Sequence, residues 1–411
     1  MAIIFVHGVN NRKENPDYET RRQVTEGFLR RFLGGVSING KPIRNSNPVF
    51  PYWGDRGVKF AWNMKSLPAA EADALGAGID QDFRPLISYI HDALPHPGAG
   101  RDEPLLALAR QSLPRAVDML AEVVIQTAPA ANREDASRFV IEAQLYASRF
   151  EPPVPPPTWL ATIASDEQFF ARLLTEISPA TAAGTEALGG RLGAIANLLA
   201  AGAAKLKMAT KAAAETILDR TGNFASTQIL GWSRQSLNAS LGRFFGDIFV
   251  YMDTRGDRQT PGPIPKFLLE QWNEAISATP GEPLVIIGHS LGGVISYDLL
   301  THFRPDLQVD LFVSVGSQVS HFEEMKRFKA SRPDIPGAGG ARVPKCPTIK
   351  HWINAYDIVD IFSYSCKAVF DGVDDYAYDT KTYVIKAHGA YLEQARFYER
   401  LRARIQALPV V

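Results

Sequence analysis

The sequence predicts an α/β fold, in which helices flank a mostly parallel central sheet and a large helical insertion interrupts the core. Short apolar, β-branched runs alternate with helical patterns near both ends of the chain, and this alternation favours parallel strands. From about residue 68 to residue 242 the strand patterns disappear, and alanine and helix-forming residues dominate. We therefore expect residues 1–67 and 243–411 to form the two parts of one core, with residues 68–242 as a cap or lid.

The first part of the core begins with a strand. Residues 3–6 form an apolar, β-branched run that ends at His7-Gly8, which predicts a central strand and its exit loop. Residues 18–33 show a helical pattern with many charges, and the glycine pair at 34–35 ends it. Residues 49–55 are rich in aromatic side chains and predict the next strand and its exit.

The insertion is expected to be helical throughout. Val117, Leu120 and Val124 recur at helical spacing, as do the apolar residues from 169 to 174. Residues 192–204 are the most apolar stretch, but they are shorter than the roughly 20 residues that span a bilayer. We interpret this stretch as a packed helix of the cap; a lid that exposes an apolar face toward lipid is the alternative.

After the insertion the α/β alternation resumes. Short apolar runs predict strands, and longer periodic segments between them predict helices. The expected strands are residues 246–251, 284–288, 309–315, 348–353 and 382–386, and the expected helices are residues 265–276, the segment after residue 290, and 391–408.

Residues 284–297, LVIIGHSLGGVISY, carry the clearest chemical signal. An apolar strand pattern leads into Gly288-His289-Ser290-Leu291-Gly292, and a helix pattern follows at once. This is the strand, sharp turn and helix of a nucleophile elbow, where the serine takes a strained backbone and its neighbours two positions away must be small. The extra Gly293 lets the helix pack closely on the sheet. A serine in an ordinary glycine-rich turn is the alternative interpretation.

A serine nucleophile needs a base and a carboxylate that orients the base. Of the eight histidines, His388 alone follows the last predicted strand and precedes the last predicted helix. Asp357 and Asp360 lie in one loop after the strand at 348–353, so the chain order is serine, acid, histidine. Either aspartate is a candidate for the acid, and a helix-capping role is the alternative for His388.

The segments FVHGVN, GHSLGG, WINAYDIVD and KAHGAYL resemble those of bacterial α/β-hydrolase serine esterases related to lipases. The resemblance covers the segments on both sides of the insertion, which itself matches no motif. It implies the α/β-hydrolase fold with Ser290, Asp360 and His388 as the catalytic triad. Ile361-Phe362 stand where the family commonly shows Pro-Val, so Asp357 is kept as the reserve acid.

The same resemblance implies an oxyanion hole made of backbone N–H groups. In α/β-hydrolases one donor follows the nucleophile and the other lies in the loop after an early strand. The corresponding positions here are Leu291 for the first donor and Gly8 or Val9 for the second.

These expectations describe a serine hydrolase of carboxylic esters that works through an acyl-enzyme and needs no cofactor or metal. The family and the apolar insertion favour an acyl lipid as substrate. Within enzymes the alternatives are a soluble small-ester hydrolase, a thioesterase or an acyltransferase. A different class is a partner-regulated, toxin-like effector whose helical insertion binds another protein, and a non-catalytic scaffold is the third class.

The composition of the chain limits its possible binding partners and its cellular compartment. The chain has 411 residues with 44 basic and 44 acidic side chains, so no net field favours nucleic acid or an anionic membrane as a partner. A transient membrane contact that depends on apolar groups stays compatible with this balance. Cys346 and Cys366 are the two cysteines, too few for a disulfide framework, and residues 1–6 are too short for a secretion signal. We expect a cytoplasmic protein.

Overall fold

The computed structural model describes residues 2–44, 47–66, 103–177, 241–382 and 384–410. At the centre of this part of the chain is a five-stranded sheet in the order β1-β4-β5-β6-β7, in which every neighbouring pair is parallel. The strands are β1 (Ala2–Val6), β4 (Leu284–His289), β5 (Val309–Val315), β6 (Ile349–Tyr356) and β7 (Val373–Ala377). The expected α/β fold with a parallel sheet is therefore present.

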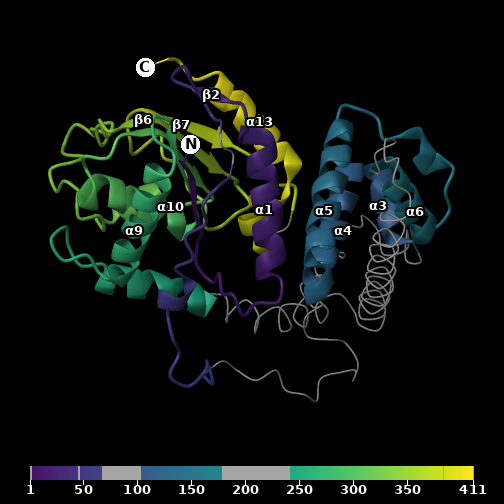
Figure 1. Ribbon diagram of the computed structural model, residues 1–411, viewed down its shortest axis with the longest axis horizontal. Coiled ribbons are helices and arrows are strands. Elements are labelled where there is room, and N and C mark those ends of the chain that lie inside the picture. Colours follow the sequence, from purple (N-terminus) through teal and green to yellow (C-terminus); the bar gives the residue numbers. More distant parts are fainter. Residues whose placement is uncertain (1, 45–46, 67–102, 178–240, 383, 411) are drawn as a thin grey trace.

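Helices cover both faces of the sheet (Figure 1). Successive residues of β1 alternate between two apolar cores: Ile3 and Phe5 belong to one, and Ile4 and Val6 to the other. Strands β4 and β5 are buried along their whole length, as parallel strands between two helical layers must be. The first core includes α1 (Tyr18–Leu33) and α13 (Ala395–Gln406), and the second includes α9 (Pro263–Ser277) and α10 (Leu291–Asp298).

Residues 103–177 form a group of helices beside α1. Val117, Leu120 and Val124 are buried on one of them, which confirms their helical spacing. The apolar side chains of this group join the core on the α1 face of the sheet, so the group packs on the core. Figure 1 shows α5 alongside α1. The helices are α3 (Pro104–Gln111), α4 (Leu113–Thr127), α5 (Arg133–Ala147) and α6 (Asp166–Ile177), with single turns η3 (Ala130–Asn132), η4 (Ser148–Phe150) and η5 (Thr158–Ala161).

The rest of the expected insertion lies outside the described residues, including the apolar stretch 192–204. Among the helices that the structure describes, none combines the length and the apolar character needed to cross a bilayer.

The strand expected at residues 49–55 is wrong. Only Val49 pairs with β1: its N–H donates to the Ile3 carbonyl at 2.7 Å, and its carbonyl accepts the Phe5 N–H at 2.9 Å. Pro51 follows two residues later and has no N–H to extend the pairing. The chain then turns through η1 (Gly54–Arg56).

The strand expected at residues 246–251 is also wrong, because residues 241–254 are helical. Phe244, Asp247 and Tyr251 are buried, whereas Phe245 and Phe249 are exposed. The buried positions are three and four residues apart, which is a helical period. The consecutive apolar residues concealed this period in the sequence.

The end of the core also differs from expectation. Residues 384–390, placed partly in a strand by the sequence pattern, form helix α12 (Val384–Ala390), and the last strand is β7. β7 escaped detection because its sequence, VDDYA, carries two adjacent acidic residues. The final helix begins at Ala395, after the 3₁₀ turn η7 (Tyr391–Glu393).

Other predicted elements are confirmed or extended. The strand at 309–315 matches β5, the helix at 265–276 matches α9, and β6 continues to Tyr356. Both cysteines are free thiols. The remaining elements are the hairpin β2 (Ser37–Ile38) and β3 (Lys41–Pro42), the π-helical turn η6 (Leu299–Phe303) and α11 (Val319–Glu324).

Candidate active site

Ser290 lies at the junction of β4 and α10 in a strained conformation. Its φ of 55° and ψ of −129° fall in a region that residues with a side chain rarely adopt. The two flanking glycines are required by contact: a Cβ on Gly288 would lie 2.5 Å from the Cα of Gly293, and one on Gly292 would lie 2.1 Å from the Val6 carbonyl oxygen. The backbone thus has the geometry expected of a nucleophile elbow.

Three predicted site residues meet at the carboxyl edge of the sheet. Ser290 Oγ lies 2.8 Å from His388 Nε2, and His388 Nδ1 lies 3.0 Å from both carboxylate oxygens of Asp360. Because a carboxylate only accepts hydrogen bonds, Nδ1 carries the proton and Nε2 is free to accept the serine hydroxyl. This arrangement can withdraw a proton from Ser290.

Asp360 is held by donors other than His388. Its carboxylate accepts the backbone N–H of Phe362 at 2.9 Å and the hydroxyl of Tyr391 at 3.2 Å. Burial and the nearby Asp360 charge raise the pKa of Tyr391 well above its ordinary value, so this hydroxyl remains a donor. Gly316, with φ of 54°, leaves room at this point: a Cβ there would lie 3.1 Å from Asp360 Oδ2.

The reserve acid, Asp357, faces elsewhere. One of its carboxylate oxygens accepts the N–H and the hydroxyl of Thr380, at 2.8 and 2.6 Å, and the other accepts the N–H of Val359 at 3.0 Å. These bonds tie the loop after β6 to the segment after β7. The structure therefore brings Asp360, and not Asp357, to His388.

His388 lies on α12, not in the loop that was expected to follow a strand. The ring of the neighbouring His289 is 4.9 Å from that of His388, and His289 Nε2 lies 2.7 Å from the His388 carbonyl oxygen. Burial and the adjacent His388 lower the pKa of His289 to about 3, so His289 is neutral and Nε2 donates its single proton to that carbonyl. His289 thereby fixes the backbone of His388.

The loop after β1 lies directly against Ser290. A Cβ on Gly8 would approach Ser290 Cβ to 2.6 Å and Oγ to 3.1 Å, so only glycine fits. The Gly8 carbonyl accepts His7 Nδ1 at 2.8 Å and Asn11 Nδ2 at 3.2 Å. In a trans peptide the carbonyl and the N–H of the same peptide unit point in opposite directions. The Val9 N–H therefore faces away from the His7 and Asn11 side chains, which bind the Gly8 carbonyl.

His7 fixes this loop. Its Nε2 accepts the Trp53 backbone N–H at 3.1 Å, its carbonyl accepts Trp53 Nε1 at 2.9 Å, and the two rings stack at 4.9 Å. Burial lowers the pKa of His7 to about 4, and Nδ1 carries the proton that it donates to Gly8. Leu291, the third oxyanion candidate, begins α10, where first-turn N–H groups have no partner within the helix.

A cavity of about 270 Å³ is lined by chain neighbours of the predicted site residues, although Ser290, Asp360 and His388 themselves are not part of its wall. Its walls include His7 and His289, which adjoin Gly8 and Ser290 in the chain. Phe5, Phe50 and Leu392 supply apolar surface. The other lining residues are Asn11, Tyr18, Arg21, Arg22, Thr25, Lys386, Gly389 and Glu393.

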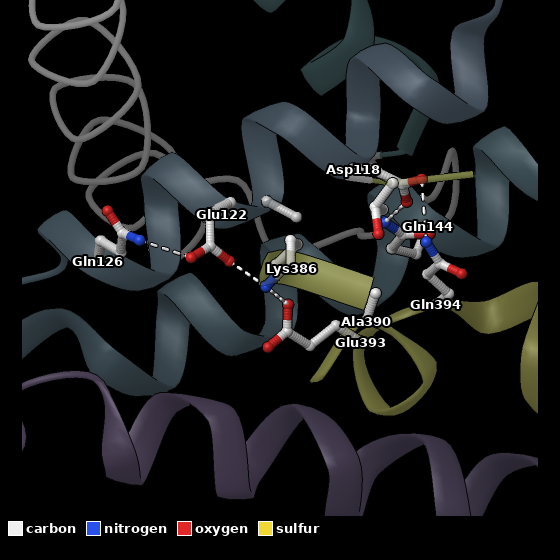
Figure 2. Close-up of a pocket in the computed structure, with 10 residues that line it drawn as sticks. Asp118, Glu122, Gln126, Gln144, Lys386, Ala390, Glu393 and Gln394 are labelled. Carbon is white, nitrogen blue, oxygen red and sulfur yellow. Dashed lines mark hydrogen bonds and ion pairs between the residues drawn. The ribbon is translucent and has the colours of Figure 1, made fainter. Parts of the chain in front are cut away.

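A second pocket, between α4 and α12, holds only about 20 Å³, which is room for one water molecule (Figure 2). Polar side chains such as Asp118, Glu122 and Lys386 line it. Its size excludes a substrate. In the described part of the chain no three His, Cys, Asp or Glu side chains are grouped as metal ligands.

Several residues of the site were not predicted from the sequence. His289 contacts His388, and Phe362 and Tyr391 contact Asp360; each is a near neighbour of a predicted residue in the chain. Tyr391 follows His388 by three residues, a spacing that places both on one side of a helical turn. This spacing is the sequence feature from which a contact of Tyr391 with the site could have been predicted.

No protein-family model, curated protein or solved structure matches this chain.

Proposed function

We propose that this protein is a serine hydrolase of the α/β-hydrolase type that cleaves carboxylic esters. The observation that carries the proposal is the line of contacts from Ser290 Oγ through His388 to Asp360, at 2.8 and 3.0 Å, with the serine in a strained turn. A Ser-His-Asp arrangement is recognised by this geometry and these roles.

The reaction proceeds through an acyl-enzyme. Ser290 Oγ attacks the ester carbonyl carbon while its proton passes to His388 Nε2, and Asp360 stabilises the imidazolium that forms. The oxyanion takes its hydrogen bonds from the N–H of Leu291 and from Gly8 or Val9. The tetrahedral intermediate expels the alcohol, which takes the proton from His388. Water then attacks the acyl-enzyme by the same route and releases the acid.

The cavity lined by His289 and Gly389, the chain neighbours of Ser290 and His388, supports an acyl group as the part of the substrate that enters the protein. A volume of about 270 Å³ equals roughly nine water molecules at about 30 Å³ each, and a methylene group takes up a similar space. Phe5, Phe50 and Leu392 offer apolar contacts to such a chain. We propose an acyl lipid over a small polar ester for this reason.

Exposed apolar residues lie near the acid. Ile358 and Ile361 are exposed on the loop after β6, and Phe245 is exposed on the helix at 241–254. Phe362 of the loop packs on Phe244 of that helix, with 4.3 Å between ring centroids. This apolar surface supports a transient contact with the lipid phase that carries the substrate.

The test is to label the purified protein and its Ser290→Ala variant with a fluorophosphonate, and to measure hydrolysis of p-nitrophenyl esters of increasing chain length. Labelling and turnover that disappear in the variant, with rates rising up to a medium-length chain, support the proposal. Turnover of acetate esters alone points to a small-ester hydrolase. Absence of labelling in folded wild type contradicts a free-standing esterase and favours the partner-regulated effector or the scaffold.

A further inference from the structure

Helix α12, which carries His388, is too short to hold its own position. It has seven residues, and isolated helices shorter than about 12–15 residues are marginal in water. Its place therefore depends on contacts with the rest of the chain. Contacts with Ser290, Asp360 and His289 hold it on the side of the site, and a different set of contacts holds it on the side of the helical segment 103–177.

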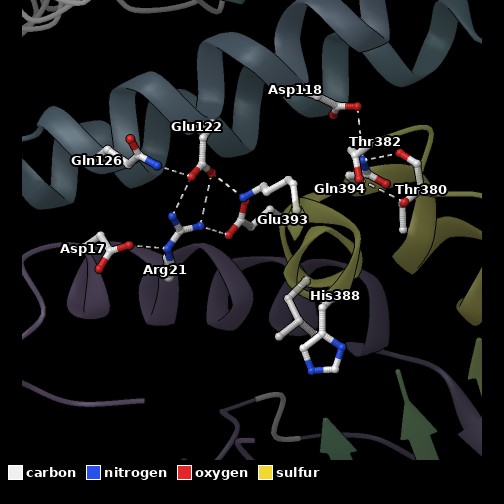
Figure 3. A network of polar contacts seen from close by, with 12 residues as sticks. Asp17, Arg21, Asp118, Glu122, Gln126, Thr380, Thr382, His388, Glu393 and Gln394 are labelled. Carbon is white, nitrogen blue, oxygen red and sulfur yellow. Dashed lines mark hydrogen bonds and ion pairs between the residues drawn. The ribbon is translucent and has the colours of Figure 1, made fainter. Parts of the chain in front are cut away.

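The second set is a quartet of charges: Arg21, Glu122, Lys386 and Glu393. Lys386, two residues before His388, contacts Glu122 of α4 and lies 2.5 Å from Glu393. Arg21 of α1 lies 2.9 Å from Glu122 and also contacts Glu393 (Figure 3). Each cation thus contacts both carboxylates, and the quartet joins α1, α4, α12 and η7.

The quartet is largely shielded from solvent, so the electrostatic interactions between its charges are strong. The side chains of Glu122 and Glu393 are 11% and 8% exposed, and that of Lys386 is 15% exposed. Burial alone would raise the pKa of Glu122, but Arg21 and Lys386 hold it well below its ordinary value. Glu122 is therefore charged, and loss of one partner would leave a buried charge uncompensated.

Asp118, one turn before Glu122 on α4, makes a second connection. It accepts Arg396 Nη2 at 2.7 Å and Gln394 Nε2 at 3.1 Å. Both donors also bind the Thr380 carbonyl, at 3.0 and 2.9 Å. The N–H and hydroxyl of Thr380 bind Asp357, in the same loop as Asp360. Glu122 and Asp118 of α4 are thus connected to residues on both sides of His388 in the chain. Through Thr380, Asp118 is also connected to the loop that carries Asp360.

We infer that α4 of the helical segment positions the catalytic base: Glu122 acts through Lys386, and Asp118 acts through Arg396 and Gln394. This inference rests on the proposed hydrolase function. Glu122 and Asp118 do not contact the reacting atoms and are positioning residues. The helical segment 103–177 then contributes to the geometry of the site, and a displacement of α4 would move His388 away from Ser290.

The test compares Glu122→Gln with Glu134→Gln, a matched change on α5 in an exposed ion pair with Arg138. Glutamine would turn an N–H group toward Lys386 or Arg21, which have no acceptor to offer. We expect kcat to fall about tenfold to a hundredfold with KM changed less than about threefold, since a small misplacement of catalytic groups has this effect. Glu134→Gln should match wild type.

Two further measurements separate positioning from folding and from the proposed function. Lys386→Met should lose activity as Glu122→Gln does, the double variant should lose no more than either, and Lys386→Arg should restore most of it. The low-field proton signal of His388 Nδ1–H bound to Asp360 should weaken in Glu122→Gln and persist in Glu134→Gln. This signal needs no turnover, so it tests the inference even if the proposed function fails. An unchanged signal and kcat in Glu122→Gln would overturn the inference.

Discussion

Asp360 accepts the backbone N–H of Phe362 at 2.9 Å, and the Phe362 ring stands edge-on to His388 with 5.2 Å between ring centroids. One residue therefore both holds the acid and covers the base. In the sequence alone, Phe362 stands out only as a departure from the Pro-Val that is common in the family the chain resembles. The structure gives this position two contacts within the site.

Phe362→Ala should lower kcat by on the order of tenfold, less than the 10²–10⁴ that general acid–base catalysis supplies in full. The backbone N–H to Asp360 stays in place, and only the cover over His388 and the contact with Phe244 are lost. Steady-state kinetics on a p-nitrophenyl ester measure the effect. Phe362→Leu, which keeps an apolar cover, is the control. Equal kinetics for alanine and wild type would show that the cover does not matter.

Asp360→Asn and Asp357→Asn should differ in their effect on catalysis. Asparagine at 360 favours the wrong tautomer of His388 and should lower kcat by about 10⁴, and it also disturbs the bonds from Phe362 and Tyr391, so the melting temperature should fall as well. Asparagine at 357 disturbs the bonds to Thr380 and Val359 and should reduce the unfolding free energy by about 1–3 kcal/mol, with kcat much less affected. Kinetics and thermal melts of both variants decide, and the reverse pattern would assign the acid to Asp357.

Gly8→Ala should disable the nucleophile, because the new methyl group would lie 2.6 Å from Ser290 Cβ. The loop that offers the oxyanion donors must then move, which should lower kcat by about 10²–10³. Gly339→Ala is the matched control, since a Cβ there meets nothing within 4 Å and Gly339 does not line the cavity. Fluorophosphonate labelling rates compare the two. If Gly8→Ala labels as fast as wild type, the loop does not contribute to the site.

Lowering the pH below about 6.5 should destabilise the protein through His7 and His289. Their pKa values are lowered to about 4 and about 3 by burial, from 6.5 in the unfolded chain, so the unfolded state binds more protons in this window. Stability is complete above pH 6.5 and falls as the pH drops, by up to about 1.4 kcal/mol per pH unit for each histidine. Urea unfolding between pH 7 and 4.5 measures it. In His289→Asn the slope should be shallower, and an unchanged slope would contradict the assignment.

Leu392→Trp should shorten the acyl chain that the protein prefers. Leu392 lines the cavity beside Phe5 and Phe50, and a larger side chain there would fill part of its 270 Å³. The ratio of kcat/KM for octanoate and acetate p-nitrophenyl esters should fall, with the acetate rate nearly unchanged. An unchanged ratio would place the acyl chain elsewhere.

The sequence predicted those parts of the fold and site that local sterics determine. The elbow at Ser290 needs small residues at fixed offsets, and parallel strands such as β5 need continuous apolar runs, so both are visible in a single segment. Chain order then led to His388 and to the loop of Asp357 and Asp360. The resemblance favoured Asp360 over Asp357, and the geometry agrees with it; the contact that turns Asp357 away, with Thr380, is distant in sequence and could not be predicted.

The sequence failed where tertiary contacts override the local pattern. The apolar run at residues 246–251 predicted a strand, but these residues are helical. Tyr251 lies on the buried side of the helix, where its hydroxyl donates a hydrogen bond to Asp298 at 2.8 Å. α12 read partly as a strand because a seven-residue helix has too few periodic positions. The link from Glu122 to Lys386 spans 264 residues, and no pattern within a segment reports such a contact.

Each lateral edge of the central sheet carries a feature that disfavours further pairing. At one edge Val49 occupies the backbone groups of Ile3 and Phe5 on β1. At the other, β7 exposes Asp374, which pairs with Arg404 of α13 at 3.0 Å, and Asp375 accepts the N–H groups of Cys366 and Lys367. Charge on an edge strand repels an incoming strand. The sheet that holds the site is thereby protected against edge-to-edge aggregation with a second copy of the chain.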